Sequence, residues 1–321
     1  MKVLVTGGAG FLGQQLIRAL CQRGELSRGG RAQSIASIVA LDTAAAPTFN
    51  DRRVESIAGD LTERTTLHRA LAGVDSIFHL AAVVSGAAEA DFDLGMRVNM
   101  DGTRALLDAC RALSHPPTVV FASSVAVFGG ELPDVVEDGT TPTPQTSYGV
   151  QKLIGELLVG DCTRRGYIDG RAVRLPTIVV RPGKPNAAAS SFASGIIREP
   201  LAGIEAICPV DAATRVWIMS PAGAVASLMH AHETPSAAWG TQRAVSLPGL
   251  TISVREMLEA LRVVGGVAAV QRVRFEADER IERIVRTWPS RFNPARALAL
   301  GFTADHDFGA IVRAYAEEHV R

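Results

Sequence analysis

The sequence begins with a glycine-rich segment that restricts what its first elements can form. Three glycines at GxxGxxG spacing follow the apolar run Lys2–Thr6: Gly7, Gly10 and Gly13. The helix-compatible stretch Phe11–Arg23 begins within the same segment. Glycines between a strand and a helix permit a tight turn, close approach of backbone N–H groups to a pyrophosphate, and close helix packing. The segment predicts a dinucleotide site, although alone it also fits an ordinary strand-to-helix turn.

Strand-like and helix-like segments alternate over the first part of the 321-residue chain, as in βαβ units. We expect strands at Lys2–Thr6, Ser37–Leu41, Val54–Ala58, Ser76–Leu80, Thr118–Ala122 and Arg171–Leu175. Helices are expected near Phe11–Arg23, Thr62–Ala72, Asp91–Leu113 and Ser147–Arg165, and a surface loop at Gly24–Gln33. The predicted fold class is α/β, with a Rossmann doubly wound parallel sheet in residues 1–175 and a smaller C-terminal substrate-binding part in residues 176–321. Segments near residues 215–250 are expected to return to the first domain.

The charge balance and the cysteines narrow the class of partner. Lys plus Arg and Asp plus Glu both total 33, so no bulk positive field attracts nucleic acid or an anionic membrane. A small-molecule partner is therefore favoured. The four cysteines form no CxxC or Cys/His cluster, so no metal site is expected. The apolar run before Gly7 is too short for a signal peptide or a membrane span, which favours a cytoplasmic protein.

The end of the second predicted strand bears on the choice of coenzyme. Asp42 follows the run Ile38-Val-Ala-Leu, where a carboxylate accepts hydrogen bonds from the adenosine ribose hydroxyls and repels a 2′-phosphate. NAD is therefore expected rather than NADP, although a simple polar strand end also explains Asp42. The glycine segment and two further strand ends supply other expected coenzyme contacts: Phe11, Leu12, Asp60, Leu61, Leu80, Ala81 and Ala82. His79 is interpreted as a core histidine.

A tyrosine and a lysine four residues apart stand at the start of a predicted helix. Tyr148 and Lys152 lie on one face about one turn apart. An adjacent ammonium stabilises the phenolate and brings the pKa of the phenol, ordinarily about 10, towards neutrality, as a general base requires. Ser124, at the end of the preceding strand, is expected to hydrogen-bond the substrate oxygen. YxxxK alone also occurs on solvated helices, but with the glycine segment and Asp42 it predicts an NAD-dependent oxidoreductase.

The order of the motifs resembles that of a known family. TGGAGFLG, GDL, HLAA, NMDGT, SSVAVFGG and SYGVQK follow one another as in extended short-chain dehydrogenases/reductases, the family of sugar-nucleotide epimerases and dehydratases. The resemblance covers nearly the whole chain. It implies a catalytic triad of Ser124, Tyr148 and Lys152, with Asn99 helping to hold a water that relays protons to the lysine. It also implies a homodimer through the helices near Asp91–Leu113 and Ser147–Arg165, and coenzyme contacts from Asn99, Ser123, Tyr148, Lys152, Pro176 and Thr177.

Residues beyond about 176 depart from the sugar-nucleotide enzymes of that family. They resemble a branch that oxidises a four-carbon sugar acid at C2 with NAD. A small polyhydroxylated carboxylate needs cations and hydroxyl donors, so the expected substrate residues are Ser124, Tyr148, Thr177, Ser190, Ser191, Arg198 and Arg215. Either arginine also fits a surface or interdomain ion pair. Two other functions stay open: a sugar-nucleotide epimerase or dehydratase, and an NAD-sensing regulator without chemistry.

Overall fold

The chain divides into two compact units, each formed from several segments. The computed structural model describes residues 1–183 and 188–320. The first unit contains Met1–Ser124, Thr146–Arg174 and Ala224–Ser246, and the second contains Val125–Gln145, Leu175–Gly223 and Leu247–Arg321. No helix in the described ranges is both long and apolar enough to cross a membrane.

The first unit is built, in the described part of the chain, on a seven-stranded sheet in the order β13-β9-β7-β6-β1-β4-β5. The strands are β1 (Lys2–Thr6), β4 (Ser37–Asp42), β5 (Val54–Ala58), β6 (Ser76–His79), β7 (Thr118–Ser124), β9 (Asp169–Leu175) and β13 (Ala244–Ser246). The pairs β1–β4, β1–β6, β4–β5, β6–β7 and β9–β13 are parallel. The sheet confirms the predicted Rossmann class, and the six predicted strands end within two residues of the observed ones.

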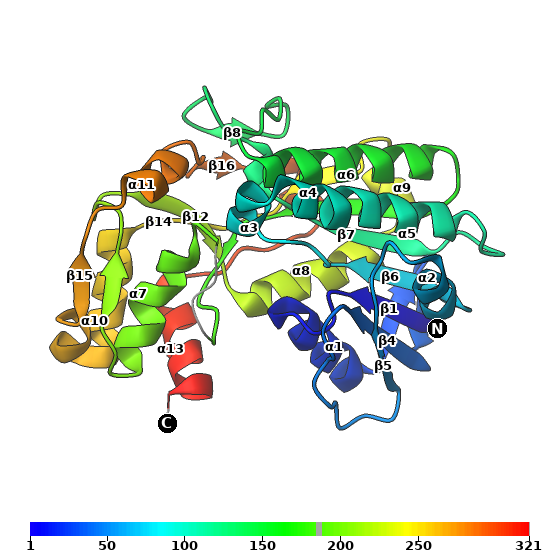
Figure 1. Cartoon of the computed structure of the whole chain (residues 1–321), viewed down its shortest axis with the longest axis horizontal. Helices are drawn as coiled ribbons and strands as arrows, with labels where there is room; N and C mark the ends of the chain where they lie inside the picture. Colours follow the sequence, from blue (N-terminus) through cyan, green and yellow to red (C-terminus); the bar gives the residue numbers. More distant parts are fainter. Residues whose placement is uncertain (184–187, 321) are drawn as a thin grey trace. The chain divides into compact units, whose positions relative to one another are not determined.

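Helices cover both faces of this sheet, which explains why its central strands β1, β6 and β7 are buried along nearly their whole length. Figure 1 shows α5 (Gly102–Cys110) and α6 (Ser147–Arg164) over one face and α1 (Phe11–Arg23) and α8 (Pro221–Glu233) over the other. Helix α2 (Arg64–Leu71) packs beside α5. The core on this side joins Leu106 and Val159 of the helices to Ile77 and Phe121 of the strands. Each such buried side chain contributes about 1.5–3 kcal/mol to folding.

The segment expected to be a surface loop before β4 is a hairpin, so that prediction was wrong. Strands β2 (Glu25–Arg28) and β3 (Arg31–Ser34) pair antiparallel. Between them, Gly29 and Gly30 have φ values of 59° and 77°. Two consecutive residues with positive φ form the two-residue turn whose twist matches that of paired strands. The glycine pair therefore closes a hairpin.

The helix expected over Asp91–Leu113 is interrupted. Asp91 caps α4 (Phe92–Gly95) by accepting a hydrogen bond from the Leu94 N–H. A π-helix, η1 (Met96–Asp101), then joins α4 to α5. π-Turns are rare and occur often at functional sites. This one contains Asn99.

The second unit packs helices around a small sheet. Strands β10 (Thr177–Ile178) and β12 (Arg215–Met219) are parallel, and β12 and β14 (Leu250–Ser253) are antiparallel. Helix α10 (Val254–Val270) begins at a capping box, in which Ser253 Oγ accepts from the Glu256 N–H and the Glu256 carboxylate accepts from the Ser253 N–H. Helix α10 contacts α7 (Ser191–Leu201) and α13 (Phe308–His319), and together they bury an apolar core.

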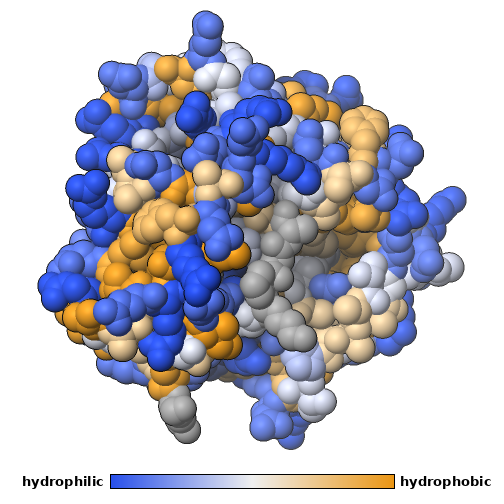
Figure 2. Space-filling model, turned by 60° about the vertical axis from the view of Figure 1, so that its left-hand side comes forward, coloured by the Kyte–Doolittle hydropathy of each residue, from blue (hydrophilic) through white to orange (hydrophobic). Residues whose placement is uncertain are grey.

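The remaining elements are short. They are α3 (Ser85–Ala90), the 3₁₀-turn η2 (Val125–Val127), β8 (Val136–Glu137), β11 (Ala206–Cys208), α9 (Ser236–Trp239), β15 (Val273–Phe275), α11 (Glu279–Val285), β16 (Phe292–Asn293) and α12 (Ala295–Ala299). Figure 2 shows apolar surface between hydrophilic side chains on one face of the molecule. The exposed large apolar side chains of the second unit include Ile204, Ile207, Val263, Val267 and Phe275.

Candidate active site

The glycine-rich turn after β1 forms a cradle in which side-chain atoms would not fit. A Cβ added at Gly7, whose φ is 72°, would lie 2.8 Å from the Ala81 nitrogen. One added at Gly13 would lie 2.1 Å from the Gly7 oxygen. Helix α1 begins after Gly10 with no side-chain cap and no acidic residue in its first turn. The positive end of this helix and the bare backbone beside it fit a dinucleotide pyrophosphate.

The carboxylate of Asp42 is held beside the same turn. Its Oδ2 accepts a hydrogen bond from the Ala9 N–H at 3.1 Å, and its Oδ1 accepts one from the Ala44 N–H at 3.2 Å. A carboxylate has about four acceptor positions, so Asp42 can also accept hydrogen bonds from ribose hydroxyls. Its charge would repel a 2′-phosphate, which favours NAD. The Oδ1 of Asp60 accepts hydrogen bonds from the N–H and the hydroxyl of Thr62, so this carboxylate also keeps acceptor positions for a ligand.

Helix α6 places Lys152 one turn after Tyr148. The Thr146 hydroxyl caps the helix by accepting a backbone N–H at 3.1 Å. Lys152 is 3% exposed, and its Nζ lies 5.6 Å from the centre of the Tyr148 ring. The Nζ also donates a hydrogen bond at 2.8 Å to the Ala122 carbonyl. This bond ties α6 to the strand that ends at Ser124, so the three predicted catalytic residues belong to one region of the first unit.

The surroundings of Lys152 set its charge. Burial lowers the pKa of its ammonium to about 8, and the negative charge of Glu156 opposes that fall. Lys152 is therefore mainly charged at neutral pH and loses its charge as the pH rises through about 8. An ammonium close to a phenol favours the phenolate, so its support for Tyr148 is present below that pH and is lost above it. The arrangement suits a general base.

A directed chain of hydrogen bonds runs from β1 to Asn99. The Thr103 hydroxyl donates its single hydrogen to the Asn99 carbonyl at 2.7 Å. Its oxygen must therefore act as the acceptor in its 2.9 Å contact with His79, whose Nε2 carries the hydrogen. The Nδ1 of His79 then accepts from the Thr6 hydroxyl at 2.7 Å. Burial, and then the charge of Lys152, lower the pKa of His79 to about 3. The ring stays neutral, and the direction of the chain is kept.

The side chain of Asn99 binds the protein itself. Its Oδ1 accepts from the Val83 N–H at 2.7 Å, and its Nδ2 donates to the Val83 carbonyl at 3.0 Å and to Gln151 Oε1 at 2.7 Å. Asn99 thus fastens the segment after β6, which carries Leu80–Ala82, to the residue before Lys152. Neither the motifs nor their spacing predicted these contacts with Val83 and Gln151. The water-relay role implied for Asn99 stays a prediction.

Several predicted contacts lie in the second unit: Pro176, Thr177, Ser190, Ser191, Arg198 and Arg215. Arg198 is 7% exposed and donates to the Arg181 carbonyl at 2.7 Å and to the Glu199 carboxylate at 2.5 Å. Its charge is compensated within the protein. Arg215 is exposed at the start of β12, which makes it the better placed of the two arginines for an external carboxylate.

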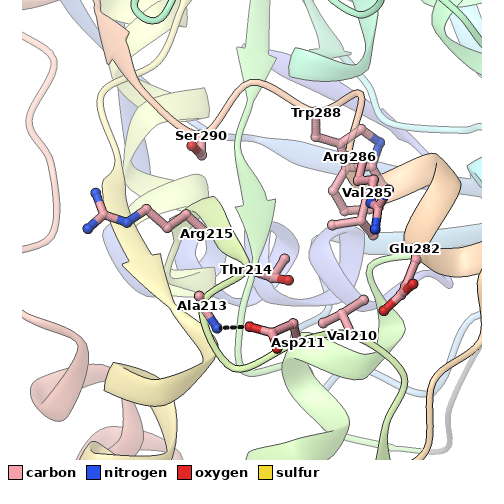
Figure 3. A pocket seen from close by; sticks show the side chains of 10 residues that line it. All are labelled: Val210, Asp211, Ala213, Thr214, Arg215, Glu282, Val285, Arg286, Trp288 and Ser290. Atoms are coloured by element: carbon pink, nitrogen blue, oxygen red, sulfur yellow. Dashed lines mark hydrogen bonds between the residues drawn. The ribbon is translucent and has the colours of Figure 1, made fainter.

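Arg215 also borders a pocket of about 380 Å³ in the second unit (Figure 3). The pocket is lined by Val210, Asp211, Ala213, Thr214, Arg215, Glu282, Val285, Arg286, Trp288 and Ser290. Figure 3 shows the guanidinium of Arg215 directed away from Arg286 and Trp288. Of these residues, only Arg215 was predicted from the sequence to bind the substrate. Arg286, Trp288 and Ser290 follow α11 in a segment without helical or strand periodicity, so no sequence pattern predicted that they line a pocket.

Comparison with known proteins connects this site to named enzymes. A family model described as the NAD dependent epimerase/dehydratase family matches residues 3–218. D-erythronate dehydrogenase from Cupriavidus necator is 56% identical over 319 residues, which are 99% of this chain and 98% of that protein. The D-erythronate dehydrogenase from Haemophilus influenzae is 44% identical, over 99% of each chain.

A solved structure gives the same assignment of fold. The crystal structure of a nucleoside-diphosphate-sugar epimerase from Agrobacterium tumefaciens matches with a TM-score of 0.92 at 44% identity, and covers 99% of this chain and 94% of that one. The family match includes the glycine cradle, Asp42 and the Tyr148–Lys152 pair. The chain therefore belongs to the NAD-dependent epimerase/dehydratase family of extended short-chain dehydrogenases/reductases.

Proposed function

We propose that the chain is an NAD-dependent dehydrogenase that oxidises D-erythronate, a four-carbon sugar acid, at C2 to 2-dehydro-D-erythronate. The observation that carries the proposal is the 56% identity to D-erythronate dehydrogenase over nearly all of both chains. Two features of the first unit support the reaction type. One is the glycine cradle beside Asp42, and the other is the buried Lys152 one turn from Tyr148.

In this reaction the protein's own groups handle the proton. The Tyr148 phenolate takes the proton of the C2 hydroxyl, and the Lys152 ammonium stabilises the phenolate before the transfer. The Ser124 hydroxyl hydrogen-bonds the substrate oxygen and keeps it in line with the base. The glycine cradle and Asp42 would hold NAD, which would supply the hydride acceptor, so the C2–H and O–H bonds would break while the carbonyl forms.

The test is a substrate comparison with purified protein. With NAD present, D-erythronate should give NADH at a higher kcat/KM than other four- to six-carbon aldonic acids. UDP-glucose should be neither epimerised nor dehydrated, as followed by NMR of the sugar protons. If another aldonic acid gave steady NADH formation and D-erythronate gave none, the proposed substrate would be wrong and that acid would replace it. Conversion of the nucleotide sugar would replace it with the epimerase or dehydratase function.

We also propose that the chain forms a homodimer through the α4–α6 side of the first unit. Val150 and Leu157 are 41% and 67% exposed, and seven residues of helix place them two turns apart on one face. Phe92 on α4 is 59% exposed. Large apolar side chains on adjoining elements favour burial against a second copy, because a two-fold interface uses the same surface twice.

Leu157→Glu is expected to convert the dimer to a monomer, because each of the two copies would bury an unpaired carboxylate in the interface. Sedimentation velocity measures the change. Val263→Glu is the matched control, since Val263 on α10 is 66% exposed but lies in the second unit. A dimer that persists in Leu157→Glu and dissociates in Val263→Glu would place the contact on the second unit instead.

We propose the cytoplasm as the place of action. Cys21, Cys110, Cys162 and Cys208 are all free thiols, as expected of a reducing compartment. Fractionation of cells that express the tagged protein tests the assignment.

A further inference from the structure

A buried carboxylate follows Lys152 by one helical turn. Glu156 is 6% exposed. Its oxygens accept hydrogen bonds from Arg174 Nε at 2.9 and 3.2 Å and from Arg174 Nη2 at 2.7 Å. Its Oε1 also accepts from the Ser123 hydroxyl at 2.5 Å. Arg174 on β9 is itself only 8% exposed. The first unit therefore buries a lysine, a glutamate and an arginine in succession.

The position of Glu156 on the helix decides which catalytic group it affects most. With a rise of 1.5 Å per residue, its place along the axis is about 6 Å from that of Lys152 and about 12 Å from that of Tyr148. Charge–charge energies fall with distance. The carboxylate therefore acts more strongly on the ammonium than on the phenol. Without it, the buried ammonium would lose its counter-charge, and the neutral form of Lys152 would be favoured.

Glu156 also holds the strand that leads to Ser124. Ser123 is 2% exposed and donates its hydroxyl hydrogen to Glu156. In the same strand, the Ala122 carbonyl accepts from Lys152. The end of β7 is therefore fastened to α6 by two side chains one turn apart. Ser124 is the next residue and the last of the strand.

We propose that Glu156 is a positioning residue for the dehydrogenase reaction: it keeps Lys152 in its ammonium form and holds the strand end that carries Ser124. Arg174 fixes the carboxylate in place. The inference rests on the proposed function, in which the charged lysine supports Tyr148 as the base. Glu156 acts through Lys152 and Ser123 rather than on the reacting atoms.

The charged and titratable groups around Lys152 support this role. Tyr148 and Glu156 are on the same helix as Lys152. His79 on β6 is close enough for the charge of Lys152 to lower its pKa, and Arg174 on β9 donates a hydrogen bond to Glu156. His79 is neutral because burial lowers its pKa to about 3. Burial lowers the pKa of Lys152 to about 8, and Glu156 is the charge that opposes the fall. Removing that charge should make Lys152 lose its proton at a lower pH.

The chain contains three lysines, Lys2, Lys152 and Lys184, so the titration can be observed directly. Protein labelled with ¹³C-lysine gives three signals, and Lys2→Arg and Lys184→Arg identify the signal of Lys152. The pH midpoint is then read without substrate or coenzyme. In Glu156→Gln we expect the midpoint to fall by about one pH unit or more, and in Glu156→Asp to stay within about 0.3.

Three further variants separate charge from folding. Arg174→Met keeps the carboxylate, so the Lys152 midpoint should not fall. Glu156→Gln with Arg174→Met removes both members of the buried pair and should give a smaller fall than Glu156→Gln alone. Because the double variant leaves no buried arginine without a partner, it can be measured in place of Glu156→Gln if Glu156→Gln does not fold. Asp161→Asn removes a carboxylate from the same helix whose side chain is 52% exposed, and should leave the midpoint unchanged.

Kinetics supply the second readout. With D-erythronate, the alkaline limb of the kcat profile of Glu156→Gln should move to lower pH by the amount that the NMR midpoint moves, with about a fivefold loss at pH 8 for a fall of about one pH unit. A purely structural role would lower kcat at every pH and leave the limb in place. An unchanged Lys152 midpoint, in the single or the double variant, would overturn the inference. A shifted midpoint in a protein that never oxidises D-erythronate would reject the proposed function and leave the role of Glu156 standing.

Discussion

Tyr148→Phe is expected to lower kcat with D-erythronate by about 10³-fold and to leave NAD binding unchanged, because positioned general bases contribute about 10²- to 10⁴-fold. Phenylalanine keeps the ring but cannot accept the hydroxyl proton. The Lys152 ammonium, 5.6 Å from the ring centre, would then have no phenolate to stabilise. Initial rates of NADH formation measure the loss, and calorimetric titration measures the affinity for NAD.

Tyr167→Phe is the matched control for that substitution. Tyr167 also lies in the first unit, where the guanidinium carbon of Arg111 stands 4.8 Å from its ring centre. Loss of its hydroxyl should change kcat by less than about twofold, as for a substitution away from the site. If Tyr148→Phe kept more than about a tenth of kcat, another group would be the base. If NAD binding fell together with kcat, the loss would report damage to the coenzyme site.

The inner strands β1, β4 and β6 of the parallel sheet could be predicted because they are buried on both faces. The predicted strands Lys2–Thr6 and Val54–Ala58 and the predicted helix Phe11–Arg23 have the bounds of β1, β5 and α1, although β5, at the edge of the sheet, is mostly exposed. The hairpin β2–β3 was missed because its strands are short, polar and largely exposed. Only the pair Gly29-Gly30 indicated a turn. The π-helix η1 was missed because one added residue hardly changes the apolar period of a long helix.

The same contrast holds within the site. Tyr148 and Lys152 were predictable because their relation is set within one helical turn. The pair Glu156–Arg174 joins α6 to β9, and Asn99 binds the segment after β6. Which of these side chains meet depends on how a helix packs against a sheet and on where a π-turn falls. Residue spacing along the chain determines neither of these, so the contacts around Lys152 could be found only in the structure.

Gly13→Ala is expected to weaken NAD binding by about a hundredfold, or about 2.8 kcal/mol. The added Cβ would lie 2.1 Å from the Gly7 oxygen, 2.9 Å from the Gly7 carbonyl carbon and 3.0 Å from the Gly8 Cα. All three are backbone atoms of the turn, so no side-chain rotation relieves the contact. The turn must move away from α1, and the cradle that fits the pyrophosphate is lost. Calorimetric titration with NAD measures the change.

Gly160→Ala makes the same change in α6, where the added Cβ meets nothing within 4 Å, and should leave NAD affinity unchanged. The two kinds of loss should then be separable. Tyr148→Phe binds NAD without turnover, whereas Gly13→Ala at saturating NAD should keep its kcat. The reason is that α6 and the Ala122 carbonyl, rather than the glycine turn, hold Lys152 beside Tyr148. Unchanged NAD affinity in Gly13→Ala would refute the cradle, and a kcat lost even at saturation would mean that the turn also positions the catalytic pair.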